Sequence, residues 1–138
     1  MKTSFAAFIF FLSGLASLAQ ACSIPGLRHE VTFERGSAEM GTAQVLVLAE
    51  WYAELRDGPL GIELVWLFAR AVEGDNRSMA VTHARASAVS VLVGTLGSTA
   101  PVPMHLDVKG ISTPRPQTYD EIVVSVIPNC AKTGKCCG

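Results

Sequence analysis

The sequence predicts one α/β domain, a two-layer sandwich in which a small mixed β-sheet carries both of its helices on one face. Three observations support this fold class. The chain has 138 residues, which suits a single domain. Stretches with strand-like alternation and stretches with helical periodicity follow one another in the order β-α-β-α-β-β. No internal repeat and no low-complexity tract interrupts them.

The first three elements lie between residues 29 and 69. Residues 29–34 alternate polar and apolar side chains, which predicts a strand with one apolar face. Residues 45–55 carry apolar side chains at helical spacing, and Asp57-Gly58-Pro59 ends this first helix. Residues 61–69 form a more continuous apolar run, which is typical of a central strand covered on both faces or nearly so.

A second helix is expected after the polar loop at residues 73–78. Its apolar side chains recur at Val81, Ala84, Ala88 and Leu92. We expect the helix to end at Gly94. The small Ala and Ser residues along it would let it pack close to a sheet.

Two further strands complete the domain. Residues 104–108 alternate as a short strand, and a turn-rich connection follows at residues 110–116. The β-branched residues 122–127 predict the last strand. The remaining tail, residues 129–138, has no periodicity. The expected organisation is therefore a leader at 1–21, a lead-in at 22–27, the domain at 28–128 and the tail.

The first 21 residues have the pattern of a secretory signal peptide. They hold 14 hydrophobic residues, after a short start that carries Lys2, and end in the small-x-small site Ala19-Gln20-Ala21. The apolar run is shorter than the roughly 20 residues that a membrane-spanning helix needs. The sequence therefore predicts export from the cytoplasm into an oxidising compartment, where disulfides persist.

The four cysteines allow two interpretations. Residues 18–22 resemble a relaxed bacterial lipobox, in which Cys22 would be acylated and would anchor the chain to the outer membrane; one disulfide would then form in the tail. Alternatively, the even number of cysteines suits two disulfides. The candidates are Cys22, Cys130, Cys136 and Cys137. Metal binding by these residues is disfavoured because no recognised ligand spacing is present, and we expect no cofactor.

Charge and motifs exclude two further classes of function. The formal net charge is −1, so no basic field exists to hold nucleic acid. No nucleophile elbow, HExxH, P-loop or dinucleotide-binding glycine motif occurs, and we therefore expect a protein that is not an enzyme. Trp51 and Trp66 lie in periodic apolar segments, which favours a place in the core over a carbohydrate-stacking platform.

Three stretches resemble the OmpA-like domain, the peptidoglycan-binding module of outer-membrane protein A, peptidoglycan-associated lipoprotein and MotB. Residues 31–40 resemble its opening strand, an aromatic residue followed by Ser-Ala-x-Leu. Residues 74–86 resemble its glycine loop and the motif Asn-x-x-Leu-Ser-x-x-Arg-Ala. Residues 120–124 take the place of its closing strand. The resemblance spans about residues 28–127 and implies the OmpA-like β-α-β-α-β-β fold.

The resemblance also implies a ligand and a binding site. The family binds diaminopimelate, whose side chain ends in an ammonium and a carboxylate on one carbon, so a receptor needs a carboxylate beside a guanidinium. The position matching the family arginine is Arg85. The family aspartate at the end of the second strand is absent, because residues 67–70 fill its place, and the paired arginines of the closing strand are replaced by Thr118-Tyr119. Glu73 or Asp75 would have to supply the missing carboxylate.

The expected binding residues are accordingly Arg85, Glu73, Asp75, Asn76 and Thr82. With this site, the chain would be a periplasmic or lipid-anchored module that tethers the outer membrane to peptidoglycan. The alternative is a degenerate OmpA-like scaffold that binds a protein partner in an envelope or secretion complex. The sequence indicates no oligomeric state.

Overall fold

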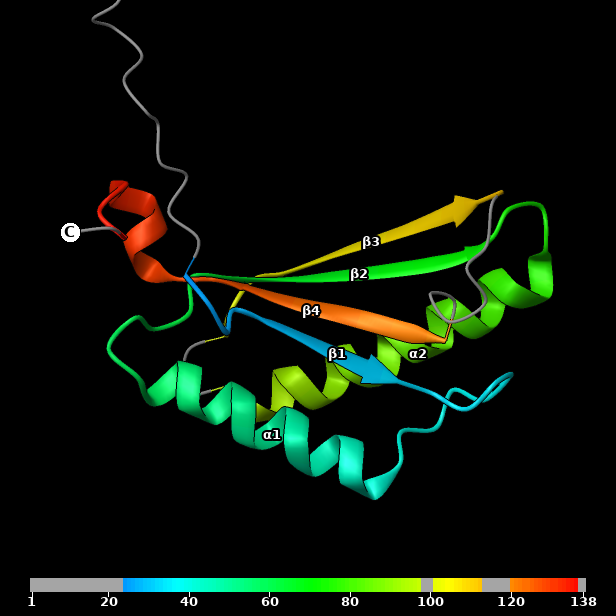
Figure 1. Cartoon of the computed structure of the whole chain (residues 1–138), viewed down its shortest axis with the longest axis horizontal. Coiled ribbons are helices and arrows are strands. Elements are labelled where there is room, and N and C mark those ends of the chain that lie inside the picture. Colours follow the sequence, from blue (N-terminus) through cyan, green and yellow to red (C-terminus); the bar gives the residue numbers. More distant parts are fainter. Residues whose placement is uncertain (1–23, 98–100, 113–119, 137–138) are drawn as a thin grey trace, which may run out of the picture.

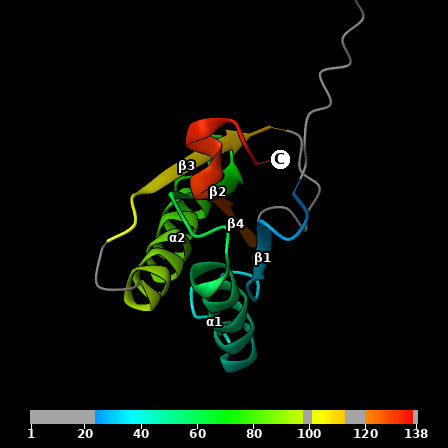
Figure 2. The same ribbon diagram turned by 90° about the vertical axis from the view of Figure 1, so that its left-hand side faces the viewer.

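The computed structural model describes residues 24–97, 101–112 and 120–136, which form one sheet with helices on a single side (Figure 1). The elements are β1 (Arg28–Thr32), α1 (Thr42–Asp57), β2 (Leu64–Val72), α2 (Asn76–Leu96), β3 (Met104–Ile111), β4 (Glu121–Ile127) and the 3-10 helix η2 (Asn129–Thr133). The turned view in Figure 2 shows α1 and α2 on the same face of the sheet. The predicted fold class and element order are confirmed.

The sheet has the strand order β1-β4-β2-β3. Strands β2 and β3 are parallel and are joined by a crossover through α2, whereas β4 lies between β1 and β2 and is antiparallel to both. The last strand of the chain is thus inserted into the middle of the sheet. This insertion brings the start of β4 beside the end of β1.

The hydrophobic core lies between the sheet and the two helices. Alternate residues of β2 and β4 face the helices, and Leu48 and Tyr52 of α1 lie fully buried against them. Ala86 of α2 and Ala69 of β2 are both buried, so small side chains let α2 pack close to the sheet as expected. Each fully buried Val or Leu side chain in this layer contributes roughly 1.5–3 kcal/mol.

Strand β2 differs from its prediction in position and in burial. It spans Leu64–Val72 rather than residues 61–69, because Gly61 has a positive φ of 60° and still belongs to the turn. The strand is central, but only one of its faces is covered. Trp66 and Phe68 lie on the open face, away from the helices, so the expectation that Trp66 belongs to the core is wrong. Trp51 packs at the edge of the core as expected.

The buried face of α2 is offset from the predicted apolar stripe. Its buried residues are Thr82, Arg85, Ala86, Val89 and Val93, whereas the predicted Ala84 is exposed. The helix also continues past Gly94 to Leu96, where the Gly97 N–H donates to the carbonyl of Val93. By length and hydropathy alone α2 resembles a membrane-spanning helix, yet its Ala86, Val89 and Val93 belong to the hydrophobic core, as in a core helix.

Strand β3 is longer than predicted. It pairs with β2 through Val72↔Ile111, so Gly110 lies in the strand and not in a turn. Gly110 lies beside Glu73, the residue that follows β2. Residues 113–116 of the predicted turn-rich connection lie outside the described residues.

The tail folds back on the start of β2. A disulfide joins Cys130 to Cys136, consistent with the expected bond within the tail. Lys132 Nζ lies 2.6 Å from Glu63 Oε1, and the Asn129 N–H donates to the carbonyl of Leu60. The predicted leader, with Cys22, and Cys137 lie outside the described residues, so the predictions for them stay open.

Candidate functional site

The first turns of α2 are fixed by three polar side chains. Asp75 is the N-cap, and its Oδ1 accepts the main-chain N–H groups of Arg77 and Ser78 at 2.9 and 3.1 Å. The Ser78 hydroxyl accepts the N–H of Val72, and the Thr82 hydroxyl donates to the carbonyl of Arg70 at 3.3 Å. The helix start is therefore attached to the end of β2, which sets the direction in which Arg85 points.

Arg85 lies on the next turn of α2 and is buried, with 3% of its side chain exposed. Its guanidinium donates to the Ser37 carbonyl from Nε at 2.6 Å and to the Glu34 carbonyl from Nη2 at 2.7 Å. Nη1 lies 3.1 Å from Asp120 Oδ1, and the guanidinium carbon stands 5.2 Å from the centre of the Phe33 ring. One arginine thereby joins α2, the loop after β1 and the start of β4.

Asp120 faces solvent on its other side. Its side chain is 24% exposed, and its Oδ2 lies 3.6 Å from Nε of Arg35, a side chain that is 80% exposed. A hollow of about 400 Å³ opens here. It is lined by Arg35, Asp75, Arg77, Thr82, Arg85 and Asp120, among others. Carboxylates and guanidinium groups thus meet at one opening, which we call the α2 hollow.

The structure brings only some of the predicted binding residues to the α2 hollow. Arg85, Thr82 and Asp75 line it, whereas Glu73 and Asn76 are not among its lining residues. Glu73 lies in the turn before α2, where its N–H donates to the carbonyl of Ile111. The carboxylate beside Arg85 comes from Asp120, not from the loop before the helix.

The sequence reasoning missed Asp120 and Arg35. Asp120 precedes β4, and its carbonyl accepts the Phe33 N–H at 2.8 Å as the β1–β4 pairing comes to its end. The signal for this contact is the strand pairing. Once β4 is known to lie antiparallel to β1, the residue before β4 must face the loop after β1, where Arg35 stands.

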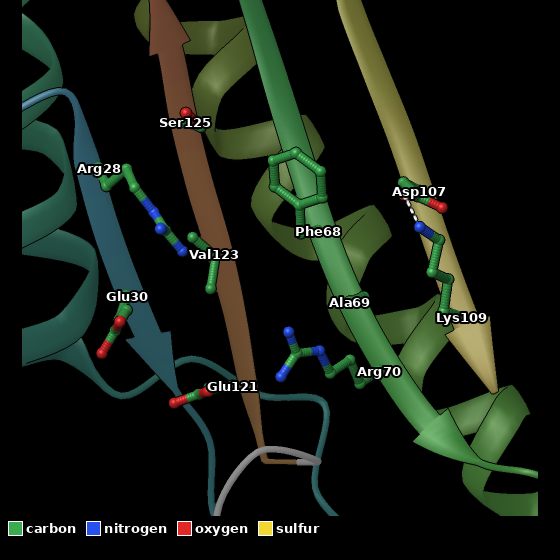
Figure 3. Close-up of a pocket in the computed structure, with 10 residues that line it drawn as sticks. All are labelled: Arg28, Glu30, Phe68, Ala69, Arg70, Asp107, Lys109, Glu121, Val123 and Ser125. Atoms are coloured by element: carbon green, nitrogen blue, oxygen red, sulfur yellow. Dashed lines mark ion pairs between the residues drawn. The ribbon is translucent and has the colours of Figure 1, made fainter. Parts of the chain in front are cut away.

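A second hollow, of about 660 Å³, lies over the open face of the sheet (Figure 3). Figure 3 shows charged side chains from all four strands gathered over it, around Phe68 and Val123. They are Arg28, Glu30, Arg70, Asp107, Lys109 and Glu121. Positive and negative side chains are both present here, as they are in the α2 hollow. The α2 hollow and the open face are separate, because no residue lines both.

Solved structures with the same arrangement identify the fold. The OmpA-like domain of FopA1 from Francisella tularensis matches with a TM-score of 0.53 over 77% of this chain and 80% of that one, at 15% identity. The chain has the OmpA-like fold. The C-terminal domain of Helicobacter pylori MotB matches with a TM-score of 0.53, over 78% of this chain and 90% of its own, at 12% identity.

A third OmpA-like structure extends the comparison. The peptidoglycan-associated lipoprotein from Burkholderia pseudomallei matches with a TM-score of 0.50 over 72% of this chain and 89% of its own, at 16% identity. No family profile matches the sequence, and no curated protein is significantly similar to it. At these identities the OmpA-like likeness concerns the fold, and the ligand must be argued from the residues.

Proposed function

We propose that this chain is a non-catalytic protein of the bacterial cell envelope whose OmpA-like domain binds peptidoglycan through the α2 hollow. The observation that supports this most directly is the meeting of Asp120 with Arg35 at the opening. A diaminopimelate ammonium would pair with Asp120, and the carboxylate on the same carbon would pair with Arg35. The receptor chemistry that the family motif would supply from β2 is then supplied from β4 and the loop after β1.

Arg85 acts in this proposal as a positioning residue. At least three of the donor groups of its guanidinium bind acceptors of the chain itself, and almost none of its side chain is exposed. The Arg85 guanidinium donates to Oδ1 of Asp120, so that Oδ2 of the same carboxylate faces the opening. The contact of Oδ2 with the exposed Arg35 is a loose ion pair worth at most about 1 kcal/mol, so a ligand displaces it at little cost.

Co-sedimentation with purified sacculi tests the proposal. The whole chain should pellet with sacculi whose stem peptides carry diaminopimelate, and less with sacculi that carry lysine there, because lysine lacks the second carboxylate. Asp120→Asn should weaken retention by about tenfold or more, since it removes the charge that meets the ammonium. It keeps an oxygen that accepts from Arg85, so the domain should remain folded.

Arg70→Gln is the matched control. Arg70 lies on the open face, outside the α2 hollow, and its replacement should leave retention unchanged. Wild-type protein that stays in the supernatant with both kinds of sacculi would contradict the proposal. That result would favour the alternative, in which the OmpA-like domain is a scaffold for a protein partner in an envelope complex.

The placement in the envelope, at the periplasmic face of the outer membrane, rests on the leader and on Cys22. If Cys22 is acylated, the chain tethers that membrane to the wall. Mass spectrometry of the mature N-terminus distinguishes the two interpretations of this cysteine. An unmodified Cys22 would refute the lipid anchor without affecting the sacculus experiment.

A further inference from the structure

The outer edge of β3 leaves a row of main-chain groups without a strand partner. Strand β3 is an edge strand, paired only with β2 (Figure 1). Val65 N–H donates to the carbonyl of Pro103, and Glu73 N–H donates to that of Ile111, so the odd-numbered residues of β3 bond to β2. By alternation, the N–H and C=O groups of its even-numbered residues point outward. Such an edge is a template for pairing with another chain.

The side chains along this edge are of two kinds. On the helix side, Met104 and Leu106 are 39% and 43% exposed. On the open face, Asp107 and Lys109 stand side by side and form an ion pair at 3.2 Å (Figure 3). Among the described elements nothing covers the apolar part of the edge, and the charged part is balanced in sign.

We propose that two copies of this chain associate through the edges of β3, antiparallel, about a two-fold axis at Val108. The result is one continuous sheet with four strands from each copy. This inference uses neither the α2 hollow nor peptidoglycan. It therefore stands or falls independently of the proposed function.

The register follows from the edge itself. Because the outward groups belong to even-numbered residues, hydrogen-bonded pairs must join even residues of one copy to even residues of the other. If Leu106 faced Val108 of the partner subunit, the two Asp107 carboxylates would lie opposite each other. If Val108 faced Gly110 of the partner subunit, the two Lys109 ammonium groups would do so. Like charges directly opposite one another destabilise a strand pair.

The register with Val108 facing the partner's Val108 removes both conflicts. Each Asp107 then lies opposite Lys109 of the partner subunit, in the non-hydrogen-bonded pairs where Cα atoms approach to about 4.5 Å. Leu106 faces Gly110 of the partner subunit, which has no side chain to obstruct it. On the helix side, Leu106 thus lies over this glycine and diagonally beside Val108 of the partner subunit. The charges and the apolar edge are thus self-complementary, as a two-fold interface requires.

Analytical ultracentrifugation of the whole chain, with its disulfide oxidised, tests this inference. Wild-type protein should sediment as a monomer–dimer equilibrium, with the dimer favoured as concentration rises. Asp107→Lys or Lys109→Asp should each raise the dimer dissociation constant about tenfold or more, because two attractive pairs become repulsive. Thermal unfolding of the same samples checks that each variant is folded.

Mixing the two charge variants gives the sharpest outcome. An equimolar mixture of Asp107→Lys and Lys109→Asp should regain dimers, since each Lys then faces an Asp in both pairs. The double variant Asp107→Lys/Lys109→Asp should dimerise as the wild type does. Val108→Pro should weaken the dimer, because it removes an outward N–H while the bonds to β2 come from the odd-numbered residues.

Arg28→Gln, on the same open face but on β1 at the opposite edge of the sheet, should leave the equilibrium unchanged. Wild-type protein that is monomeric at every attainable concentration would overturn the inference. A dimer that neither the charge variants nor Val108→Pro weakens would overturn it too, as would a variant mixture that stays monomeric.

Discussion

Replacing Arg85 with methionine should be the most damaging single substitution on the α2 hollow side of the domain. Methionine has a similar stem, so packing against Phe33 is largely kept while the guanidinium is removed. The carbonyls of Glu34 and Ser37 and one oxygen of Asp120 then lose their donor. The loop after β1 and the start of β4 are no longer tied to α2.

The expected cost is about 3–4 kcal/mol in the free energy of unfolding. Hydrogen bonds to a charged donor contribute about 1.5–3 kcal/mol each, and three of them would give a larger sum. The sum is reduced because Asp120 is 24% exposed and water can replace part of what it loses. Breaking a buried pair by removing one partner typically costs about 3–5 kcal/mol. A domain of this size has a total stability of about 5–15 kcal/mol.

Urea unfolding followed by circular dichroism measures this loss. Arg85→Lys is the informative companion, because it keeps the charge but its single nitrogen cannot reach the three acceptors that the three guanidinium nitrogens contact. It should cost less than Arg85→Met. Arg77→Gln, at the exposed rim of the same hollow, should change stability by at most about 0.5 kcal/mol. A loss below about 1 kcal/mol for Arg85→Met would refute the view that this arginine holds the three segments together.

Three other substitutions have defined outcomes. Tyr52→Phe should raise stability in urea by about 1 kcal/mol, because the buried Tyr52 hydroxyl has no hydrogen-bond partner among the described residues; a clear loss would contradict this. Burial lowers the pKa of His29 below its ordinary 6.5, so the native state favours neutral histidine and stability should fall as the pH drops below that value. His29→Phe should flatten the dependence of melting temperature on pH in this range, and an unchanged pH dependence would refute the view that His29 causes the loss. Gly61→Ala should cost more in a thermal melt than Gly74→Ala, because both have positive φ but only the Cβ at 61 meets the Asn129 side chain; equal costs would contradict this.

The element order was predictable because hydrophobic periodicity is a local property. The predictions that were wrong concern which side chains are buried, and burial depends on which elements pack against each residue in the folded chain. A stripe counted from apolar residues alone passes over Thr82 and Arg85, although both are buried on α2, and it includes the exposed Ala84. Likewise, Trp66 in an apolar run reads as a core residue, since nothing in the run itself shows that one face of β2 stays open.

The candidate site was predictable only from its helix side. Arg85 and Thr82 follow from a motif contained within one helix, whereas Asp120 lies 35 residues further along the chain. It reaches Arg85 because β4 enters the sheet between β1 and β2, and this placement depends on long-range pairing. The absence of an aspartate at the end of the second strand therefore does not mean that the site lacks a negative charge. One carboxylate is absent from residues 67–70, but another stands 3.1 Å from the same guanidinium.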